Sequence, residues 1–270
     1  MLRIVLTSLT IGLLSFTSPE PNLTSKNTDA LVVDAGAVAA NISVLTFVEK
    51  KQAFEEHMEH IYDRADLRRK GLSKEVFRNA LVGYHNFKLN KTGAPSKPIL
   101  TVVDFTKSSS EKRMWIIDLQ AKKVLFNTLV AHGRNTGQDM ATKFSNTPNS
   151  YMSSIGFYLT DATYYGKHGL SLKLSGMDGK FNSNAMARAI VVHGADYVSE
   201  AFVKQNGRLG RSLGCPSVPK EISKDVIETI KNKTVMYIHG NESSYSSDYL
   251  NQESAIETYA MQELGDIIKA

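Results

Sequence analysis

The chain has a single cysteine, Cys215, and the residues around it are typical of a nucleophile. It lies in the segment 210–217 (GRSLGCPS), where small residues on both sides let a substrate approach the sulfur. Gly214 allows a backbone geometry that other residues resist, and the amides of Gly214 and Cys215 could face a developing oxyanion. A helix beginning near Pro219 would point its positive end at this loop and favour the thiolate. The alternative is a small hydrophobic residue buried in a turn.

A cysteine nucleophile needs a base, and His193 is the strongest candidate. It follows the apolar run 189–192 (AIVV), which predicts a strand, and it precedes Gly194. A histidine at the end of a strand is held firmly by the sheet. The alternative is a structural histidine whose ring nitrogens are satisfied by neighbours.

A zinc enzyme is a rival interpretation of the histidines. His132, His168 and His193 each precede a glycine, and they would have to converge with Asp196 or Asp161 as zinc ligands. No HExxH or comparable short-range pair supports this arrangement. We therefore expect no metal and no cofactor.

The elements that would position these residues are two helices followed by a β-rich region. Apolar residues at helical spacing predict one helix from about residue 47 and a second with Ser73 as its N-cap. Ile222, Val226 and Ile230 give one later helix its apolar face. Short β-branched or aromatic runs predict strands at 99–105, 114–119, 124–130, 155–160, 170–174, 189–193 and 234–239, with a hairpin turn at 120–123. This order favours an α+β fold with a mixed β sandwich or barrel over alternating βαβ units.

Composition and charge exclude several classes of protein. The chain has 270 residues, of which 42% are hydrophobic and 22% charged, as in soluble globular proteins. One cysteine excludes internal disulfides and multi-cysteine metal clusters. The net charge is +5, but basic and acidic residues are interspersed. This pattern suits an anionic surface or polymer and not nucleic acid, whose binders gather their basic residues in a stripe.

The N-terminus predicts export. Residues 1–3 form a short positive region, and residues 4–16 are a mostly apolar run too short to span a membrane. We expect contact with the membrane only through this signal peptide during export. The predicted segments are a signal peptide at 1–17, a linker at 18–46, a helical segment at 47–95, a catalytic domain at 96–240 and a polar tail with a short helix at 241–270. We expect the last segment to be dispensable.

Two short motifs together resemble a known family. His193-Gly194, followed by Ser212-Leu213-Gly214-Cys215, resembles the signature of the L,D-transpeptidase catalytic domain of bacterial cell-wall enzymes, a YkuD-like family. The stretches 129–137 (LVAHGRNTG), 144–148 (FSNTP) and 207–212 (GRLGRS) also resemble a murein L,D-transpeptidase subfamily. The similarity covers roughly residues 75–240. It implies a predominantly β catalytic domain in an exported protein of the periplasm or cell envelope.

The resemblance also implies a role for each matching residue. Cys215 would be the nucleophile, His193 the proton acceptor and donor, and the Gly194 carbonyl the group that orients the imidazole. The backbone of Gly214 and Cys215 would form the oxyanion hole, and Ser212, which occupies the Ser/Thr position of the motif, would contact the substrate.

The chain departs from the family pattern in two ways. His193 lies 22 residues before Cys215, a longer separation than in the commonest versions. Ser217 stands where the family motif has an arginine, so we expect Arg211 to make the substrate contact instead. We expect His168 to line the pocket wall.

The implied reaction is acyl transfer between peptidoglycan stem peptides. The cysteine would attack a donor tetrapeptide between its diamino acid and its terminal D-Ala, leaving a thioester. An acceptor amine would then form a 3→3 crosslink, whereas water would make the enzyme an L,D-carboxypeptidase. A non-catalytic wall-binding module is the remaining alternative. The sequence does not specify the diamino acid, the choice between transfer and hydrolysis, or the oligomeric state.

Overall fold

The computed structural model describes residues 45–89 and 94–264, and side chains as far as residue 262. The predicted signal peptide and nearly all of the predicted linker lie outside these residues. Within the described residues, no helix is both long enough and apolar enough to cross a membrane.

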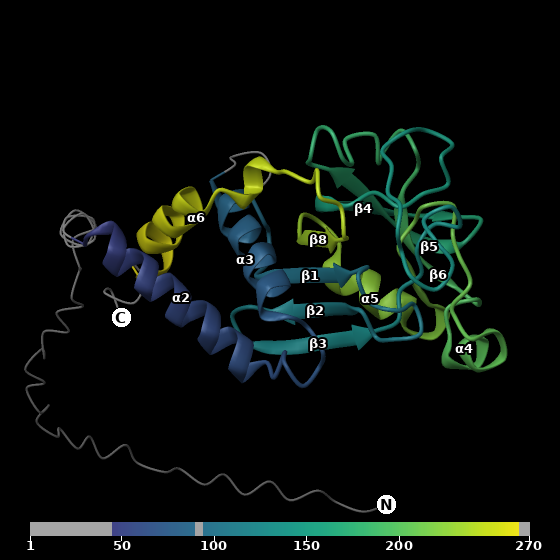
Figure 1. The fold of residues 1–270 in the computed structure, drawn as a ribbon, viewed down its shortest axis with the longest axis horizontal. Helices are drawn as coiled ribbons and strands as arrows, with labels where there is room; N and C mark the ends of the chain where they lie inside the picture. Colours follow the sequence, from purple (N-terminus) through teal and green to yellow (C-terminus); the bar gives the residue numbers. More distant parts are fainter. Residues whose placement is uncertain (1–44, 90–93, 265–270) are drawn as a thin grey trace, which may run out of the picture.

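Two capped helices open the described chain. α2 (Phe47–Arg64) begins with a capping box between Thr46 and Glu49. α3 (Lys74–Lys88) begins at Ser73, whose hydroxyl accepts from the Val76 N–H, so the predicted N-cap is confirmed. α3 is buried over most of its length and contacts β1 and β8, while α2 packs outside it (Figure 1).

Eight strands form one mixed sheet, as the α+β prediction required. Their order is β3-β2-β1-β8-β4-β5-β6-β7, in which only the β1–β8 and β6–β7 pairs are parallel. All seven predicted strands are present. The strands are β1 (Ile99–Asp104), β2 (Met114–Asp118), β3 (Lys123–Thr128), β4 (Gly156–Gly166), β5 (Gly169–Gly176), β6 (Val191–Ala195), β7 (Ser217–Pro219) and β8 (Val235–His239).

A helical segment starts directly after Pro219, as predicted, but the three residues before it form a strand. Residues Ser217–Pro219 form β7, because Val218 is buried in the sheet and the backbone of Pro219 is extended. A 3-10 turn, η1 (Lys220–Ile222), separates this strand from α5 (Ser223–Ile230), which packs on β5 and β6. The short helix α4 (Glu200–Asn206) was not predicted, because it buries no side chain and so has no apolar spacing.

The two edges of the sheet meet at a seam beside the cysteine loop. The chain leaves β3, one edge strand, and its residue Ala131 forms a bridge to Ser217 in β7, the other edge strand. A second bridge joins Gly133 to Ser212. The sheet is therefore curved and nearly closed, with residues 212–217 held at the point of closure.

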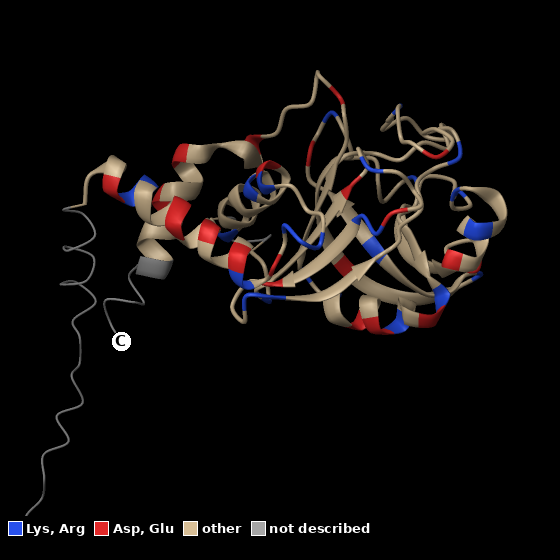
Figure 2. Cartoon of the chain, turned by 60° about the horizontal axis from the view of Figure 1, so that its bottom comes forward, with Lys and Arg blue, Asp and Glu red and all other residues tan. Residues whose placement is uncertain are grey.

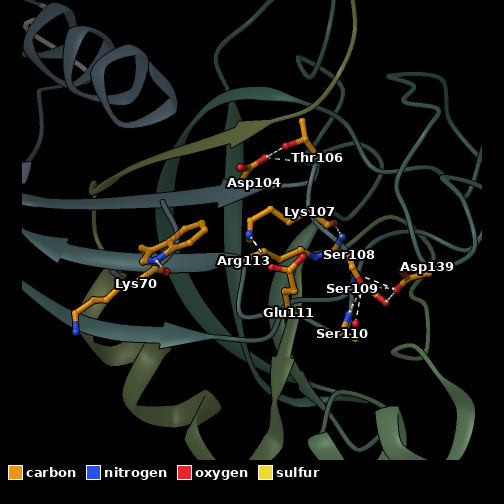
Figure 3. A network of polar contacts seen from close by, with 11 residues as sticks. Lys70, Asp104, Thr106, Lys107, Ser108, Ser109, Ser110, Glu111, Arg113 and Asp139 are labelled. Atoms are coloured by element: carbon orange, nitrogen blue, oxygen red, sulfur yellow. Dashed lines mark hydrogen bonds and ion pairs between the residues drawn. The ribbon is translucent and has the colours of Figure 1, made fainter. Parts of the chain in front are cut away.

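Buried polar groups brace this seam from the β1–β2 side. Arg113 is fully buried and donates to the carbonyls of Val130 and Lys107. The nearby Asp139 carboxylate accepts from the backbone and hydroxyl of Ser109 (Figure 3). The Ser109 hydroxyl also accepts from the Leu209 N–H at 3.1 Å, which ties this network to the chain that leads to the cysteine loop.

The part of the C-terminal segment that the structure describes packs into the core, contrary to the expectation that the segment is dispensable. After the 3-10 turn η2 (Asp248–Leu250), α6 (Gln252–Tyr259) packs on α3 and α2 and continues into η3 (Ala260–Leu264). Ala255, Ile256 and Tyr259 are buried in the same cluster as the two N-terminal helices and one face of the sheet.

The segment between β8 and α6 is anchored by a buried carboxylate. Asp178 accepts from the phenol of Tyr245 at 2.8 Å and from the hydroxyl of Ser247 at 2.6 Å. The same carboxylate accepts from the Phe157 N–H, which fixes the segment to β4. Lys and Arg are interspersed with Asp and Glu over the molecule (Figure 2).

Candidate active site

Cys215 and His193 line one cavity of about 390 Å³. Its walls come from the β4–β5 hairpin, β6, the loop before β6 and the cysteine loop. The lining residues are Tyr164, Gly166, Lys167, His168, Ser171, Arg188, Ala189, Ile190, Val191, His193, Tyr197, Arg211, Ser212, Leu213 and Cys215. The structure thus brings together the predicted nucleophile and base with the three predicted substrate contacts. Among the contacts of the described residues, no hydrogen bond joins the thiol to the imidazole.

The thiol of Cys215 is half-buried against the strand that carries the base. Its sulfur accepts from the Val191 N–H at 3.5 Å, and it lies 3.7 Å from the carbonyl oxygen of Ala189, to which the S–H points. Burial raises the pKa of the Cys215 thiol, although the Val191 N–H, Arg188 and Lys167 act in the opposite direction. The strand β7 and the turn η1 lie between the cysteine loop and α5 in the chain, and the expected stabilisation of the thiolate by a helix end stays a prediction.

Hydrogen bonds within the loop fix its conformation. Gly214 has a φ of 124°, and a Cβ at this position would lie 2.8 Å from the carbonyl oxygen of Met152, so only glycine fits. The Ser212 hydroxyl accepts from the Gly214 N–H at 3.0 Å and donates to the Cys215 carbonyl at 2.7 Å. Of the two amides predicted to bind an oxyanion, that of Gly214 is therefore already engaged.

His193 is held in one tautomer by its own strand. Its Nδ1 lies 2.9 Å from the carbonyl oxygen of Gly194, which can only accept, so Nδ1 carries the proton and Nε2 is the acceptor. The start of α5 leaves no room for a side chain at Gly194, where a Cβ would lie 2.5 Å from the Ser223 hydroxyl. Burial, with smaller contributions from the charges of His168 and Lys167, lowers the pKa of His193. The ring is therefore neutral at pH 7, as a general base must be.

His168 and its neighbours come from the tip of the β4–β5 hairpin. The His168 ring stacks on that of His193, with centroids 4.3 Å apart and planes inclined by 20°. Tyr164 and Lys167 of the same hairpin also line the cavity. The sequence placed His168 in the pocket wall, but it contains no signal for the stacking, which depends on the pairing of β5 with β6.

Two arginines line the cavity while their guanidinium groups also bind backbone carbonyls. Arg211 donates to the carbonyls of Arg134 and Gly137. Arg188, which sequence reasoning missed, donates to the carbonyl of Met152 at 2.6 Å. Arg188 lies in a polar loop without a motif, so its position carries no local signal. With Lys167, these residues give the cavity three cationic side chains, and none of the described residues lining it is acidic.

His132 lies apart from the other two histidines. Its Nδ1 accepts from the Arg113 guanidinium at 2.8 Å, and burial together with Arg113 lowers the pKa of His132 to about 4. Asp196 is exposed and pairs with Lys220. Over residues 45–89 and 94–264, no three His, Cys, Asp or Glu side chains are grouped to hold a metal ion. The three histidines proposed as zinc ligands therefore do not converge.

Comparison with known proteins identifies one family. The family model described as an L,D-transpeptidase catalytic domain matches residues 68–239. None of the curated proteins matches the chain.

Several solved structures share a distant likeness to the chain. An L,D-transpeptidase from Mycobacterium smegmatis is 11% identical with a TM-score of 0.33, over 53% of this chain and 59% of that one. An L,D-transpeptidase from Stackebrandtia nassauensis is 16% identical with a TM-score of 0.32, over 70% and 78%. A helical cell shape determining protein from Campylobacter jejuni is 13% identical with a TM-score of 0.37, over 65% and 61%. The chain covers less than two thirds of the length of the first of these structures.

Proposed function

The chain belongs to the L,D-transpeptidase catalytic-domain family, and from this premise we propose that it is a cysteine-dependent L,D-transpeptidase acting on peptidoglycan stem peptides. The observation that carries the proposal is the shared cavity of Cys215 and His193. A neutral imidazole with its acceptor nitrogen fixed by the Gly194 carbonyl is suited to take the thiol proton.

The first half of the reaction forms a thioester. The Cys215 sulfur attacks the carbonyl carbon between the diamino acid and the terminal D-Ala of a donor tetrapeptide, while its proton passes to Nε2 of His193. The imidazolium then gives this proton to the amine of the departing D-Ala as the C–N bond breaks. Because burial raises the pKa of the Cys215 thiol, the resting thiol is protonated and needs a base to take its proton.

The second half transfers the acyl group. An amine of a neighbouring stem attacks the thioester and loses a proton to His193, and the sulfur leaves and recovers a proton from the imidazolium. The product is a 3→3 crosslink. Water in the place of the amine would release a tripeptide instead.

The lining of the cavity supports an anionic substrate. Lys167, Arg188 and Arg211 face a stem peptide that ends in a carboxylate, and desolvation in a cavity strengthens such attraction. The Cys215 amide is the backbone donor that we assign to the developing oxyanion, because the Gly214 amide is bound by Ser212.

The reaction can be tested with purified disaccharide tetrapeptide and mass spectrometry of the products. We expect a crosslinked dimer together with free D-Ala, and neither product from Cys215→Ala. Tripeptide without dimer would assign the L,D-carboxypeptidase activity. Absence of any product from the folded wild-type protein would contradict an enzymatic role and favour a wall-binding module.

We propose that the enzyme is exported to the bacterial cell envelope, where the proposed substrate lies. The short apolar run at residues 4–16 supports a cleaved signal peptide. N-terminal sequencing of the protein recovered from the envelope should start close to residue 18. An uncleaved protein that stays in the cytoplasm would contradict this location.

A further inference from the structure

Two hydroxyl groups form a chain of hydrogen bonds that starts at the ring of His193. The Ser217 hydroxyl oxygen is 2.9 Å from His193 Nε2, and the Tyr197 phenol oxygen is 3.1 Å from the Ser217 hydroxyl oxygen. Ser217 is fully buried and lies opposite His193 in the parallel pairing of β6 and β7. The sequence marked Ser217 only as the residue at the arginine position of the family motif.

The direction of each hydrogen bond follows from the Gly194 carbonyl. Because Nδ1 of His193 donates to that carbonyl, Nε2 has no proton and must accept, so Ser217 donates to it. Ser217 then has a free lone pair for a donor. Tyr197 fills this role, since burial raises the pKa of its phenol and keeps it protonated.

Tyr197 is held in this position by the backbone. The Gly210 N–H donates to the Tyr197 carbonyl at 2.9 Å. A Cβ at Gly210 would lie 2.4 Å from the Cβ of Tyr197, so glycine is required for the tyrosine to pack here. The phenol therefore reaches Ser217 from a side chain that also lines the cavity.

We propose that Ser217 and Tyr197 form a positioning pair that holds His193 ready as a base and then stabilises its protonated form. A hydroxyl group can both donate and accept. For the transfer, the Cys215 S–H turns from the Ala189 carbonyl to the ring and the Ser217 O–H rotates away from Nε2, whose lone pair then takes the thiol proton. The Ser217 oxygen accepts a hydrogen bond from the new Nε2–H and its O–H donates a hydrogen bond to the phenol oxygen of Tyr197, whose own O–H turns away from Ser217. No covalent bond to the serine or the tyrosine forms or breaks. The proposal rests on the proposed roles of Cys215 and His193.

The hydroxyl groups of Ser217 and Tyr197 can offset the cost of forming charges in the buried site. Burial disfavours both the thiolate and the imidazolium, so the charged pair formed during attack needs neighbours that stabilise it. The Gly194 carbonyl stabilises the ring at Nδ1, and Ser217 provides the matching acceptor at Nε2. An arginine at position 217 could only donate, and it would oppose the imidazolium.

The test measures alkylation of Cys215 by iodoacetamide as a function of pH, with intact-protein mass spectrometry as the readout. Ser217→Ala should lower the rate at pH 7 by about tenfold, the loss expected for one hydrogen bond to a charged group. At about pH 10, where hydroxide removes the thiol proton without the imidazole, its rate should approach that of the wild type. Ser217→Thr, which keeps the hydroxyl, should restore the rate at pH 7.

Tyr197→Phe provides a second variant that removes only the outer hydroxyl. It should show the same pH-dependent loss to a smaller extent, whereas Tyr158→Phe, which removes a buried phenol bonded to the Ser154 carbonyl, should not. The ¹⁵N shift of His193 Nε2 should also move in Ser217→Ala, and the measured pKa of the ring should fall. The proposal would be overturned if the ¹⁵N shift and the pKa of His193 were unchanged in Ser217→Ala and if the alkylation rate fell equally at every pH. Because iodoacetamide replaces the wall peptide, this outcome is separate from failure of the transpeptidase assignment.

Discussion

The imidazole of His168 lies face to face with that of His193, with ring centroids 4.3 Å apart. The contact joins the tip of the β4–β5 hairpin to β6, whose register with β5 places Ser171 opposite His193. Burial lowers the pKa of His193, and the charge of His168 lowers it further. The hairpin therefore shapes the cavity and also acts on the basicity of the predicted base.

Removing the His168 ring should have a milder effect than removing the base. We expect His168→Ala to raise the pKa of His193 and to slow acylation of Cys215 severalfold, because the wall is opened while the proton path stays in place. Tyr165→Ala is the matched control, since Tyr165 is 81% exposed at the same hairpin and does not line the cavity. Rapid-mixing kinetics with a carbapenem would measure the acylation rate of both variants, and its pH dependence would give the pKa of His193. A loss as large as that of His193→Ala would show that His168 itself moves the proton.

Cys215 should be the only site of covalent modification. A carbapenem should add once to the wild-type protein and not to Cys215→Ala, because its strained carbonyl mimics the amide of the stem peptide. The substitution should change the free energy of unfolding by only about 1 to 3 kcal/mol. Intact-protein mass spectrometry and urea unfolding measure the two effects. An adduct on the alanine variant would disprove the assignment of the nucleophile.

Cys215 and His193 should behave as one unit in a double-mutant cycle. His193→Ala should slow acylation by about 10² to 10⁴-fold, the range expected for a lost general base. Adding it to Cys215→Ala should cause no further loss of tetrapeptide turnover, because the base has no nucleophile left to serve. A chelator should leave the wild-type rate unchanged. Comparable losses at His132, His168 and His193 together with inhibition by the chelator would support the zinc alternative instead.

His132 should make the fold sensitive to acid. Its pKa is lowered from 6.5 to about 4 in the folded protein, so between these values the unfolded chain binds the proton and the folded chain does not. Stability must then fall as the pH falls through this window, by up to about 3 kcal/mol at its lower end. His132→Asn should flatten this part of the curve in urea unfolding, while substitution of the exposed His60 by Gln should not. If the unfolding free energy of His132→Asn fell with pH as steeply as that of the wild type, this prediction would be wrong.

The C-terminal helix should contribute substantially to stability. Ile256 is buried in the cluster between α6, α3 and the sheet, so Ile256→Ala should cost about 2 to 5 kcal/mol of unfolding free energy. Glu253→Ala on the exposed side of the same helix is the control and should change stability by less than about 0.5 kcal/mol. Equal effects of the two substitutions would mean that α6 does not belong to the cooperative core.

The parts of the site that could be predicted are those whose signals are local. Cys215 and Gly214 are adjacent, and His193 follows an apolar strand, so short motifs were enough. The hydrogen bond from Ser217 to His193 could not be predicted, because it depends on the parallel pairing of β6 with a strand of three residues that ends in proline. Arg188 was missed for the same reason, since only the folded loop brings its charge to the cavity.

The fold also differs from the prediction where the sequence has no local signal. β4 extends beyond its predicted end because its outer half, residues 161–166, is largely exposed and has no apolar alternation. The packing of α6 was missed because its sequence is polar on average and the helices that cover it are about 170 to 200 residues away in the chain.

The seam where the two edges of the sheet meet also completes the surroundings of the thiol. Ala131 and Ser217 are 86 residues apart in the chain, so their bridge closes a long loop. Before this bridge forms, Cys215 is an exposed thiol outside the burial that raises its pKa in the folded protein. We therefore expect acylation of Cys215 by a carbapenem to appear during refolding only after the sheet has closed, so that its rate reports the closure.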